Sequence, residues 1–387
     1  MESTETIDIR EISEGLDKVV VLGSDTWSLM LYSALSPFSP KIKINGVPTR
    51  ANLHTLLVGD VATAKSRICN IIQMIAPKSE RITKVTEASL EGVAGKGYIE
   101  RGLIDASNNG VLVIPEFTAM FQRFKILREV MDADRITIMK AGETKEIDVN
   151  ITFFAGCNPV KDFFQEGGRL RSQIPFKEGV LSRFDCLIPL LSTCRKNEIL
   201  LDRINIFGEC EAEVDLLRIR NQLDSLSREM LKVKEVVLER EQRQRIREVF
   251  LRHNRDLGSR PLLLLRDLET ISRLVNVIAT ARGNNGDSAT QVASNEDVDR
   301  GIELWETLID LRKSLYTKID REILSVKEKI LQEIIKLGKT RTVELERVIV
   351  NSQSLCSKAT FYRKLSELRI EDKIGQDGLR DGLVYSS

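Results

Sequence analysis

The stretch Leu56–Ser66, with the sequence LLVGDVATAKS, contains residue types that bind phosphate groups. An apolar run leads into Gly59, and Lys65–Ser66 open a segment whose apolar residues recur at helical spacing, which predicts strand, loop and helix. Backbone N–H groups of such a loop bind phosphate oxygens, the lysine reaches the β- and γ-phosphates, and the hydroxyl binds Mg²⁺. We therefore predict a nucleotide site, with Ser66 as metal ligand, formed by Gly59, Asp60, Val61, Ala62, Thr63, Ala64, Lys65 and Ser66.

This loop departs from the pattern G-x-x-x-x-G-K-[ST] at one position, because Ala64 replaces the second glycine. A chance match in a structural turn is the alternative for the motif alone, so the surrounding elements must decide. Four continuous apolar runs alternate with helical stretches from residue 51 to about residue 208. Such runs are typical of parallel strands buried on both faces, and they predict an α/β ATPase core. They are Leu56–Val58, Val111–Ile114, Ile151–Ala155 and Leu187–Leu191.

The segments before and after this core have different patterns. Residues 1–50 are short for a separate domain, and we expect them to pack on the core. Residues 209–324 are nearly all helical, which predicts a lid. Apolar residues there keep 3-4 spacing from Leu216 to Val237, as in a coiled-coil seam. This seam either packs on a neighbouring helix of the same chain or contacts a partner subunit.

The last segment, residues 325–387, has the pattern of three helices followed by a hairpin, which predicts a winged helix. Basic side chains on its third predicted helix would then face DNA phosphates. These are Lys358, Arg363, Lys364 and Arg369. A charged surface without a ligand is the alternative interpretation of this helix.

The composition limits the classes of protein to which the chain can belong. Its 387 residues, 42% of them hydrophobic, suffice for the cores of two or three domains. The formal net charge is +1, so a polyanion would have to be bound by local basic patches. The six cysteines are scattered without a C-x-x-C pair, which predicts a reducing compartment and no structural zinc. We find no secretory signal and no membrane-spanning run, and expect a cytoplasmic protein.

Polar residues that follow the predicted strands could complete an ATPase site. Glu116 ends the run that begins at Val111, in the place of a Walker B carboxylate, and Asn158 follows the next run in the place of sensor 1. Arg183, in LSRFD, is suited to stabilise transition-state charge on a neighbouring subunit's nucleotide. Arg266, in LRDLE, lies where a second sensor would be in the helical lid.

Taken together, these motifs resemble those of the minichromosome-maintenance (MCM) family of AAA+ replicative helicases. The shared motifs are LLVGDxxTAKS, MKAG (139–142), NP (158–159), LSRFD (181–185), RDLE (266–269) and the C-terminal winged helix, in the family's order. The resemblance covers about residues 50–387. It implies an AAA+ core with a helical lid, and a nucleoid-associated hexameric ring that binds ATP and Mg²⁺ and moves along single- or double-stranded DNA with other replication proteins.

The resemblance also implies roles for single residues. Lys65 and Ser66 would hold nucleotide and metal, Glu116 would polarise the attacking water and Asn158 would orient it, while Arg183 and Arg266 would act in trans. Two inserts match the family's subgroup of AAA+ proteins. Residues 136–147 resemble its pre-sensor-1 hairpin, with Lys140 as a channel contact to DNA, and residues 90–104 resemble a shortened helix-2 insert, with Lys96 as a second contact.

Two features depart from the family pattern. The first 50 residues are too few for the family's large N-terminal oligonucleotide-binding domain. Pro115 stands where the family has an aspartate that holds Mg²⁺ through its water shell, and proline offers no side-chain oxygen. We expect ATP to bind and hydrolysis to be slow, unless Asp105, Asp132 or Asp134 compensates.

Three functions are therefore in competition. The first is an MCM-like ATPase and helicase, and the second is a catalytically impaired ATP-binding regulator or ring partner of an active helicase. The third is another member of the same AAA+ clade, such as a chelatase-type motor. DNA-stimulated ATP turnover by the chain alone separates the first from the second, and DNA affinity that falls with salt excludes the third.

Overall fold

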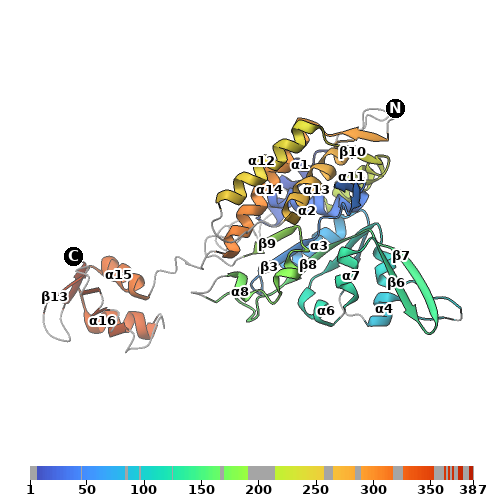
Figure 1. Cartoon of the computed structure of the whole chain (residues 1–387). Helices are drawn as coiled ribbons and strands as arrows, with labels where there is room; N and C mark the ends of the chain where they lie inside the picture. Colours follow the sequence, from blue (N-terminus) through green and yellow to red (C-terminus); the bar gives the residue numbers. More distant parts are fainter. Residues whose placement is uncertain are drawn as a thin grey trace. The chain divides into compact units, whose positions relative to one another are not determined.

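The structure is a computed structural model, and the chain divides into two compact units, Met1–Lys318 and Ile319–Ser387 (Figure 1). It describes residues 7–44, 46–82, 86–95, 97–123, 125–165, 170–190, 214–256, 265–283, 289–316, 326–352, 361–362, 365–366, 368–369, 374–377 and 383–386.

The first unit is built around a sheet of five parallel strands. Their order across the sheet is β4 (Ser79–Arg81), β5 (Gly110–Ile114), β8 (Ile151–Cys157), β3 (Thr55–Gly59) and β9 (Cys186–Leu190). Every residue of β3, β5, β8 and β9 is buried, as expected for strands covered on both faces. The predicted α/β core with a parallel sheet is thus confirmed. The short polar edge strand β4 was not foreseen.

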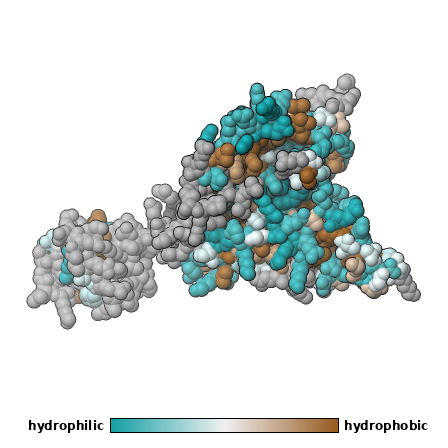
Figure 2. All heavy atoms as spheres, in the orientation of Figure 1, coloured by the Kyte–Doolittle hydropathy of each residue, from teal (hydrophilic) through white to brown (hydrophobic). Residues whose placement is uncertain are grey.

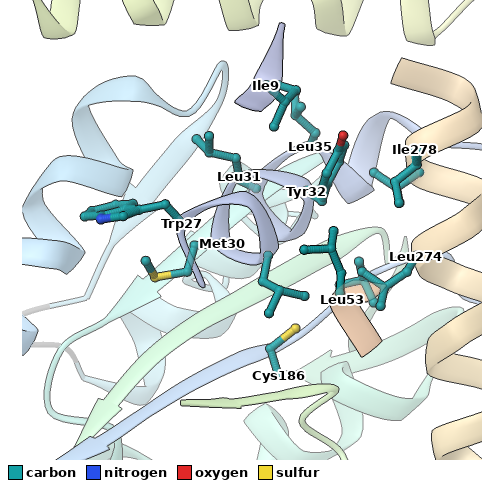
Figure 3. Close-up of a cluster of buried hydrophobic side chains, with 14 of the residues drawn as sticks. Ile9, Trp27, Met30, Leu31, Tyr32, Leu35, Leu53, Cys186, Leu274 and Ile278 are labelled. Atoms are coloured by element: carbon teal, nitrogen blue, oxygen red, sulfur yellow. The ribbon is translucent and has the colours of Figure 1, made fainter. Parts of the chain in front are cut away.

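Helix α2 (Ser24–Leu35) lies at the centre of the main hydrophobic cluster (Figure 3). Ten of its twelve residues are buried, and the indole of Trp27 donates a hydrogen bond of 2.9 Å to the carbonyl of Val20. The same cluster contains Leu53, just before β3, and Leu274 from the helical part of the unit. Helix α1 (Ile9–Val19) packs against α2 through one apolar face.

Short elements connect the strands of the sheet. Helix α3 (Lys65–Ile75) follows β3, and the hairpin β6 (Arg135–Lys140) and β7 (Glu143–Asp148) precedes β8. The others are η1 (Ser36–Phe38), β1 (Ile42–Ile44), β2 (Val47–Thr49), α4 (Glu87–Glu91), α5 (Leu103–Ser107), α6 (Phe117–Arg123), α7 (Ile126–Asp132), α8 (Leu170–Gln173) and α9 (Glu178–Leu181).

The described part of the predicted helical segment includes the long helices α11 (Leu216–Met230), α12 (Arg240–Asp256), α13 (Leu265–Arg282) and α14 (Asn295–Tyr316). The strands β10 (Glu235–Val237) and β11 (Thr290–Val292) form a parallel pair between them, which periodicity did not predict.

The apolar seam predicted from Leu216 to Val237 ends as a helix at Met230. Its buried residues, among them Leu223, face the main hydrophobic cluster, where α11 packs against α3 and α13. The hypothesis that this seam contacts a partner subunit was wrong, because the chain covers it internally.

The second unit has its own small core. Helix α15 (Val326–Leu337) is followed by α16 (Thr342–Glu346), the π-helical turn η2 (Arg347–Ser352) and a sheet of order β12 (Thr340–Arg341), β14 (Leu383–Ser386), β13 (Ile374–Asp377). Buried Phe361, Leu365 and Leu368 pack with α15 and α16 in this core. The predicted DNA contacts Lys358, Arg363 and Lys364 lie outside the described residues, and Arg369 is exposed.

The described part of the chain contains no helix that is both long and apolar enough to cross a bilayer. On the face shown in Figure 2, hydrophilic residues predominate and apolar residues are scattered among them.

Candidate nucleotide site and trans-acting arginines

The predicted phosphate loop connects β3 to α3 with the expected geometry. Strand β3 ends at Gly59 and helix α3 begins at Lys65. A Cβ on Gly59 would lie 2.3 Å from the carbonyl oxygen of Leu190, so only glycine fits there. Ala62 and Ala64 have φ values of 65° and 62°, the left-handed conformation that glycine adopts with less strain. The loop therefore keeps the glycine-type conformation at position 64 although its residue is alanine.

Lys65 points into this loop. It is buried, and its Nζ donates hydrogen bonds to the carbonyl oxygens of Gly59 (2.8 Å) and Asp60 and to Thr63 Oγ1 (3.3 Å). Burial lowers the pKa of Lys65, while nearby groups, including the carboxylate of Glu116, raise it. The ammonium thus lies where loop acceptors surround it, in the position from which it could bind phosphate oxygens instead.

Asp60 fixes the loop from the other side. Its buried carboxylate accepts a hydrogen bond of 2.6 Å from the backbone N–H of Phe164, and the N–H of Val61 donates to the carbonyl of Asp162 (3.0 Å). The segment after β8 is thereby fastened to the phosphate loop. The sequence contained this aspartate in the motif, but nothing in its spacing indicated a partner 104 residues away.

Glu116 and Asn158 lie at the same edge of the sheet as Lys65. Strand β8 pairs with both β3 and β5, so the carboxyl ends of the three parallel strands meet. Asn158 follows the last residue of β8 and is half-buried, and Glu116 is exposed two residues beyond β5. This edge can bind a triphosphate and orient a water molecule.

Pro115 lies directly after β5, so its missing N–H removes no hydrogen bond from the ladder that ends at Ile114 and Ala155. A Cβ on the facing Gly156 would lie 2.7 Å from the Pro115 carbonyl oxygen, so glycine is required there. The backbone accommodates the proline, and what is missing is a carboxylate.

The three candidate replacements for that carboxylate were wrong. Asp105 pairs with Lys145 (2.8 Å), Asp132 with two arginines and Asp134 with Lys41 (2.9 Å). Asp105 precedes β5, and the segment with Asp132 and Asp134 contacts His54 before β3 and Val149 before β8, so all three lie toward the amino edge of the sheet, whereas Pro115 follows a strand at the carboxyl edge.

The residues at the carboxyl edge fit a Mg²⁺ that arrives with the nucleotide. The Ser66 residue is exposed in the first turn of α3, and the exposed Glu116 can act through water. Magnesium commonly keeps several waters and shares phosphate oxygens with few protein ligands. The described residues contain no group of three or more His, Cys, Asp or Glu side chains arranged to hold a metal by themselves.

Arg183 and Arg266 are brought together by one carboxylate. Arg183 Nε lies 2.6 Å from Asp132 Oδ2, and Arg266 Nη2 lies 3.6 Å from Asp132 Oδ1. The two guanidinium groups also donate to backbone carbonyls, Arg183 to Gly179 and Arg266 to Ser182 at 3.3 Å. Two residues predicted from motifs 83 positions apart thus form one cluster.

This arginine cluster lies across the sheet from the phosphate loop of its own chain. Arg183 precedes β9, which pairs with β3 from Cys186–Thr55 to Leu190–Gly59. Five strand residues at about 3.3 Å each separate the two edges by about 13 Å or more. The arginines therefore cannot contact a nucleotide bound at Lys65 of the same subunit.

A buried charged network holds the backbone beside Arg183. Asp185 pairs with Arg50 (3.2 Å) and Arg273 (2.7 Å), and Arg50 donates to the carbonyl of Arg183 (3.1 Å). Burial raises the pKa of Asp185, but the two arginines lower that pKa by more, so the carboxylate stays ionised. Sequence reasoning used LSRFD only for its arginine and missed that Asp185 anchors it.

The predicted DNA hairpin has a tight turn at Ala141 and Gly142, with φ values of 50° and 84°. Lys140 lies beside this turn and is 22% exposed. Its Nζ pairs with Glu91 (3.1 Å) and donates to the carbonyl of Gly92 (2.9 Å), at the start of the helix-2 insert. Lys96 lies outside the described residues, so its predicted role is not addressed by the structure.

Comparison with known proteins agrees with this geometry. Residues 26–200 match the MCM P-loop domain. DNA replication licensing factor MCM5 of Oryza sativa subsp. indica is 22% identical over 372 residues, 88% of this chain and 47% of that protein. DNA helicase MCM8 of Gallus gallus is 27% identical over 157 residues, 38% of this chain and 19% of that protein.

Zygotic DNA replication licensing factor mcm3 of Xenopus laevis is 28% identical over 160 residues, 39% of this chain and 20% of that protein. The chain spans about half the length, or less, of these curated relatives. Residues 26–200 thus match the MCM P-loop domain and form the parallel sheet with its phosphate loop, and 88% of the chain is similar to an MCM protein.

Proposed function

We propose that this chain is an ATP-binding subunit of a ring-shaped DNA translocase of the MCM type. One observation carries the proposal: Lys65 and the pair Arg183 and Arg266 lie at opposite edges of one sheet. A head-to-tail arrangement of subunits brings the arginine edge of one copy to the phosphate-loop edge of the next, and such interfaces close into rings. Each complete site then uses Lys65, Glu116 and Asn158 from one copy and the arginines from its neighbour.

The chemistry of this site is phosphoryl transfer to water. The loop and Lys65 bind the triphosphate; Ser66 would hold Mg²⁺ together with the nucleotide oxygens, and the chemistry supplied by a bound metal would be neutralisation of phosphate charge. Glu116 polarises the attacking water, which Asn158 orients, and the neighbour's arginines stabilise the charge that develops in the transition state. Because Pro115 offers no oxygen to the metal's water shell, binding of ATP is retained while hydrolysis is slow.

DNA binding is proposed for the hairpin β6–β7 and for the second unit. In this proposal Lys140 contacts the DNA backbone from the ring channel, which requires it to leave Glu91 and Gly92. The order of helices and strands in Ile319–Ser387 supports a winged helix. The assembly that we propose is a hexameric ring.

A second candidate function is favoured by Pro115. A subunit with a weakened metal site but intact arginines would bind ATP and join or restrain an active helicase as a ring partner, because its arginines still complete a neighbour's site.

The test is ATP turnover by the purified chain with and without single-stranded DNA, with Lys65→Ala as the inactive control. DNA-stimulated turnover supports the translocase, and ATP binding without turnover supports the ring partner. A chain that stays monomeric by light scattering and does not bind labelled ATP contradicts both. DNA affinity that does not fall with salt contradicts the proposed phosphate contacts.

A further inference from the structure

Asp132 is the last residue of helix α7, and its side chain contacts both arginines of the proposed trans site. Each carboxylate oxygen serves a different guanidinium: Oδ2 lies 2.6 Å from Arg183 Nε and Oδ1 lies 3.6 Å from Arg266 Nη2. One side chain therefore links the two guanidinium groups, in addition to the backbone carbonyls of Gly179 and Ser182 that each group contacts by itself. The backbone of Arg183 is fixed separately, through the hydrogen bond that its carbonyl accepts from Arg50.

The position of Asp132 is not one that helix stability favours. A carboxylate at a helix C-terminus faces the negative end of the helix dipole, an interaction that is unfavourable by about 0.3–1 kcal/mol. Since the described contacts of the Asp132 carboxylate are with the two arginines, their positions account for its placement.

The contacts that hold the arginines also leave donors for a ligand. Arg183 donates hydrogen bonds from Nε to Asp132 and from Nη1 to the Gly179 carbonyl. Arg266 donates from Nη1 to the Ser182 carbonyl, and its Nη2 forms an ion pair with Asp132. A guanidinium has five N–H donors in a fixed planar arrangement. Among the described residues, Arg183 Nη2 and Arg266 Nε have no hydrogen-bond acceptor, so both groups can bind phosphate oxygens while still attached to Asp132.

We propose that Asp132 is a positioning residue, which presents Arg183 and Arg266 as one unit to the γ-phosphate of ATP bound by the neighbouring subunit. This inference rests on the proposed function, because it requires the arginines to act in trans. Loss of the carboxylate leaves two like charges with no common partner, and misplacement of catalytic groups by about 1 Å costs about a hundredfold in rate. The arginines then act independently and less effectively.

The direct test is Asp132→Asn, which keeps the shape of the side chain and removes its charge. We expect at least a tenfold loss in kcat, within the range that misplacement of catalytic groups produces, and less than a twofold change in KM for ATP. Asp132→Glu keeps the charge and should recover part of the loss. Asp134→Asn is the matched control. Asp134 lies two residues after Asp132 and pairs with Lys41 (2.9 Å), so this change also removes an ion pair, but turnover should not change.

Mixing subunits separates positioning from misfolding. Asp132→Asn subunits keep the phosphate loop, and Lys65→Ala subunits keep the arginines, so an equal mixture should recover about a quarter of the wild-type turnover from the interfaces that combine both intact halves. Arg183→Ala mixed with Lys65→Ala should recover similarly. Asp132→Asn mixed with Arg183→Ala should not recover, because both variants lack the same half.

The outcomes distinguish failure of the proposed function from failure of the role proposed for Asp132. If Arg183→Ala and Lys65→Ala do not complement, the arginines do not act in trans and the proposed function fails. If they complement but Asp132→Asn retains full kcat, or fails to complement Lys65→Ala, only the role of Asp132 is overturned. Where turnover is too slow to compare, retention of fluorescent ADP with aluminium fluoride is measured instead, and wild-type retention by Asp132→Asn overturns the proposal.

Discussion

Replacing Pro115 by aspartate tests whether the missing carboxylate limits ATP hydrolysis. Position 115 lies one residue beyond β5, at the edge where Lys65 and Asn158 also lie. The proline makes no ladder hydrogen bond that aspartate would have to replace, so the sheet should keep its register. The unfolded chain gains conformational freedom, which lowers the free energy of unfolding by about 0.4–1 kcal/mol.

The expected effect is on the metal and on the transition state. A carboxylate that holds the water shell of Mg²⁺ should stabilise the transition state by about 1.4–2.7 kcal/mol, which corresponds to a rise in kcat of about ten- to a hundredfold. The assay is steady-state turnover at saturating ATP, repeated over a series of Mg²⁺ concentrations. The Mg²⁺ concentration for half-maximal turnover should fall as kcat rises.

Two controls separate the carboxylate from the loss of the proline ring. Pro115→Ala removes the ring without adding an oxygen, and its turnover should stay at the wild-type level. Pro115→Asp combined with Lys65→Ala should remain inactive. If Pro115→Asp leaves kcat unchanged, or if Pro115→Ala raises kcat equally, the reasoning about the metal site is refuted.

Three further predictions follow from buried or paired residues. Burial lowers the pKa of His54 well below 6.5, so in acid the unfolded chain binds a proton that the folded chain does not. The free energy of unfolding should therefore decrease as the pH drops below 6.5, by about 1.4 kcal/mol at pH 5.5. Urea unfolding of wild type and His54→Asn at pH 7.5 and 5.5 checks this. Leu223→Ala should lower the free energy of unfolding by about 2–5 kcal/mol without changing assembly size in light scattering, since the side chain is fully buried in its own chain. Lys140→Ala should weaken DNA binding and reduce its salt dependence, whereas Glu91→Gln, which frees the lysine, should strengthen binding; equal affinity of all three proteins contradicts a DNA role for this hairpin.

Much of the sheet could be predicted from sequence because buried parallel strands read as continuous apolar runs. The runs at Leu56, Val111, Ile151 and Leu187 all became strands of one sheet. Strand β4 escaped because its three residues are polar and it lies at the sheet edge, where no periodicity is imposed. The parallel pair β10–β11 was not predicted for another reason. Its strands lie far apart in the sequence, and pairing between distant segments leaves no local pattern.

The site was predictable where one motif carries a function by itself, as in the loop that ends at Lys65. It was not predictable where function depends on which side chains meet in space. Asp132 was considered only as a metal ligand, yet it faces the arginines because α7 ends at the amino edge of the sheet. The apolar spacing around Leu223 was equally compatible with an internal contact and a partner, and only the packing of α11 on α3 decided between them.

The separation of the two half-sites also reconciles the competing functions. The half-site proposed to bind ATP contains Pro115 in place of the aspartate that would hold the metal, while the half-site formed by Arg183, Arg266 and Asp132 keeps its ion pairs. Because the halves lie at opposite edges of the sheet, a defect in the first does not affect the second. Under the proposed function, a subunit of this kind would hydrolyse its own ATP slowly and still complete the site of a neighbour whose metal ligands are intact. We therefore predict that, in a ring mixed with active subunits, loss of the arginine cluster lowers ATP turnover more than loss of the phosphate loop does.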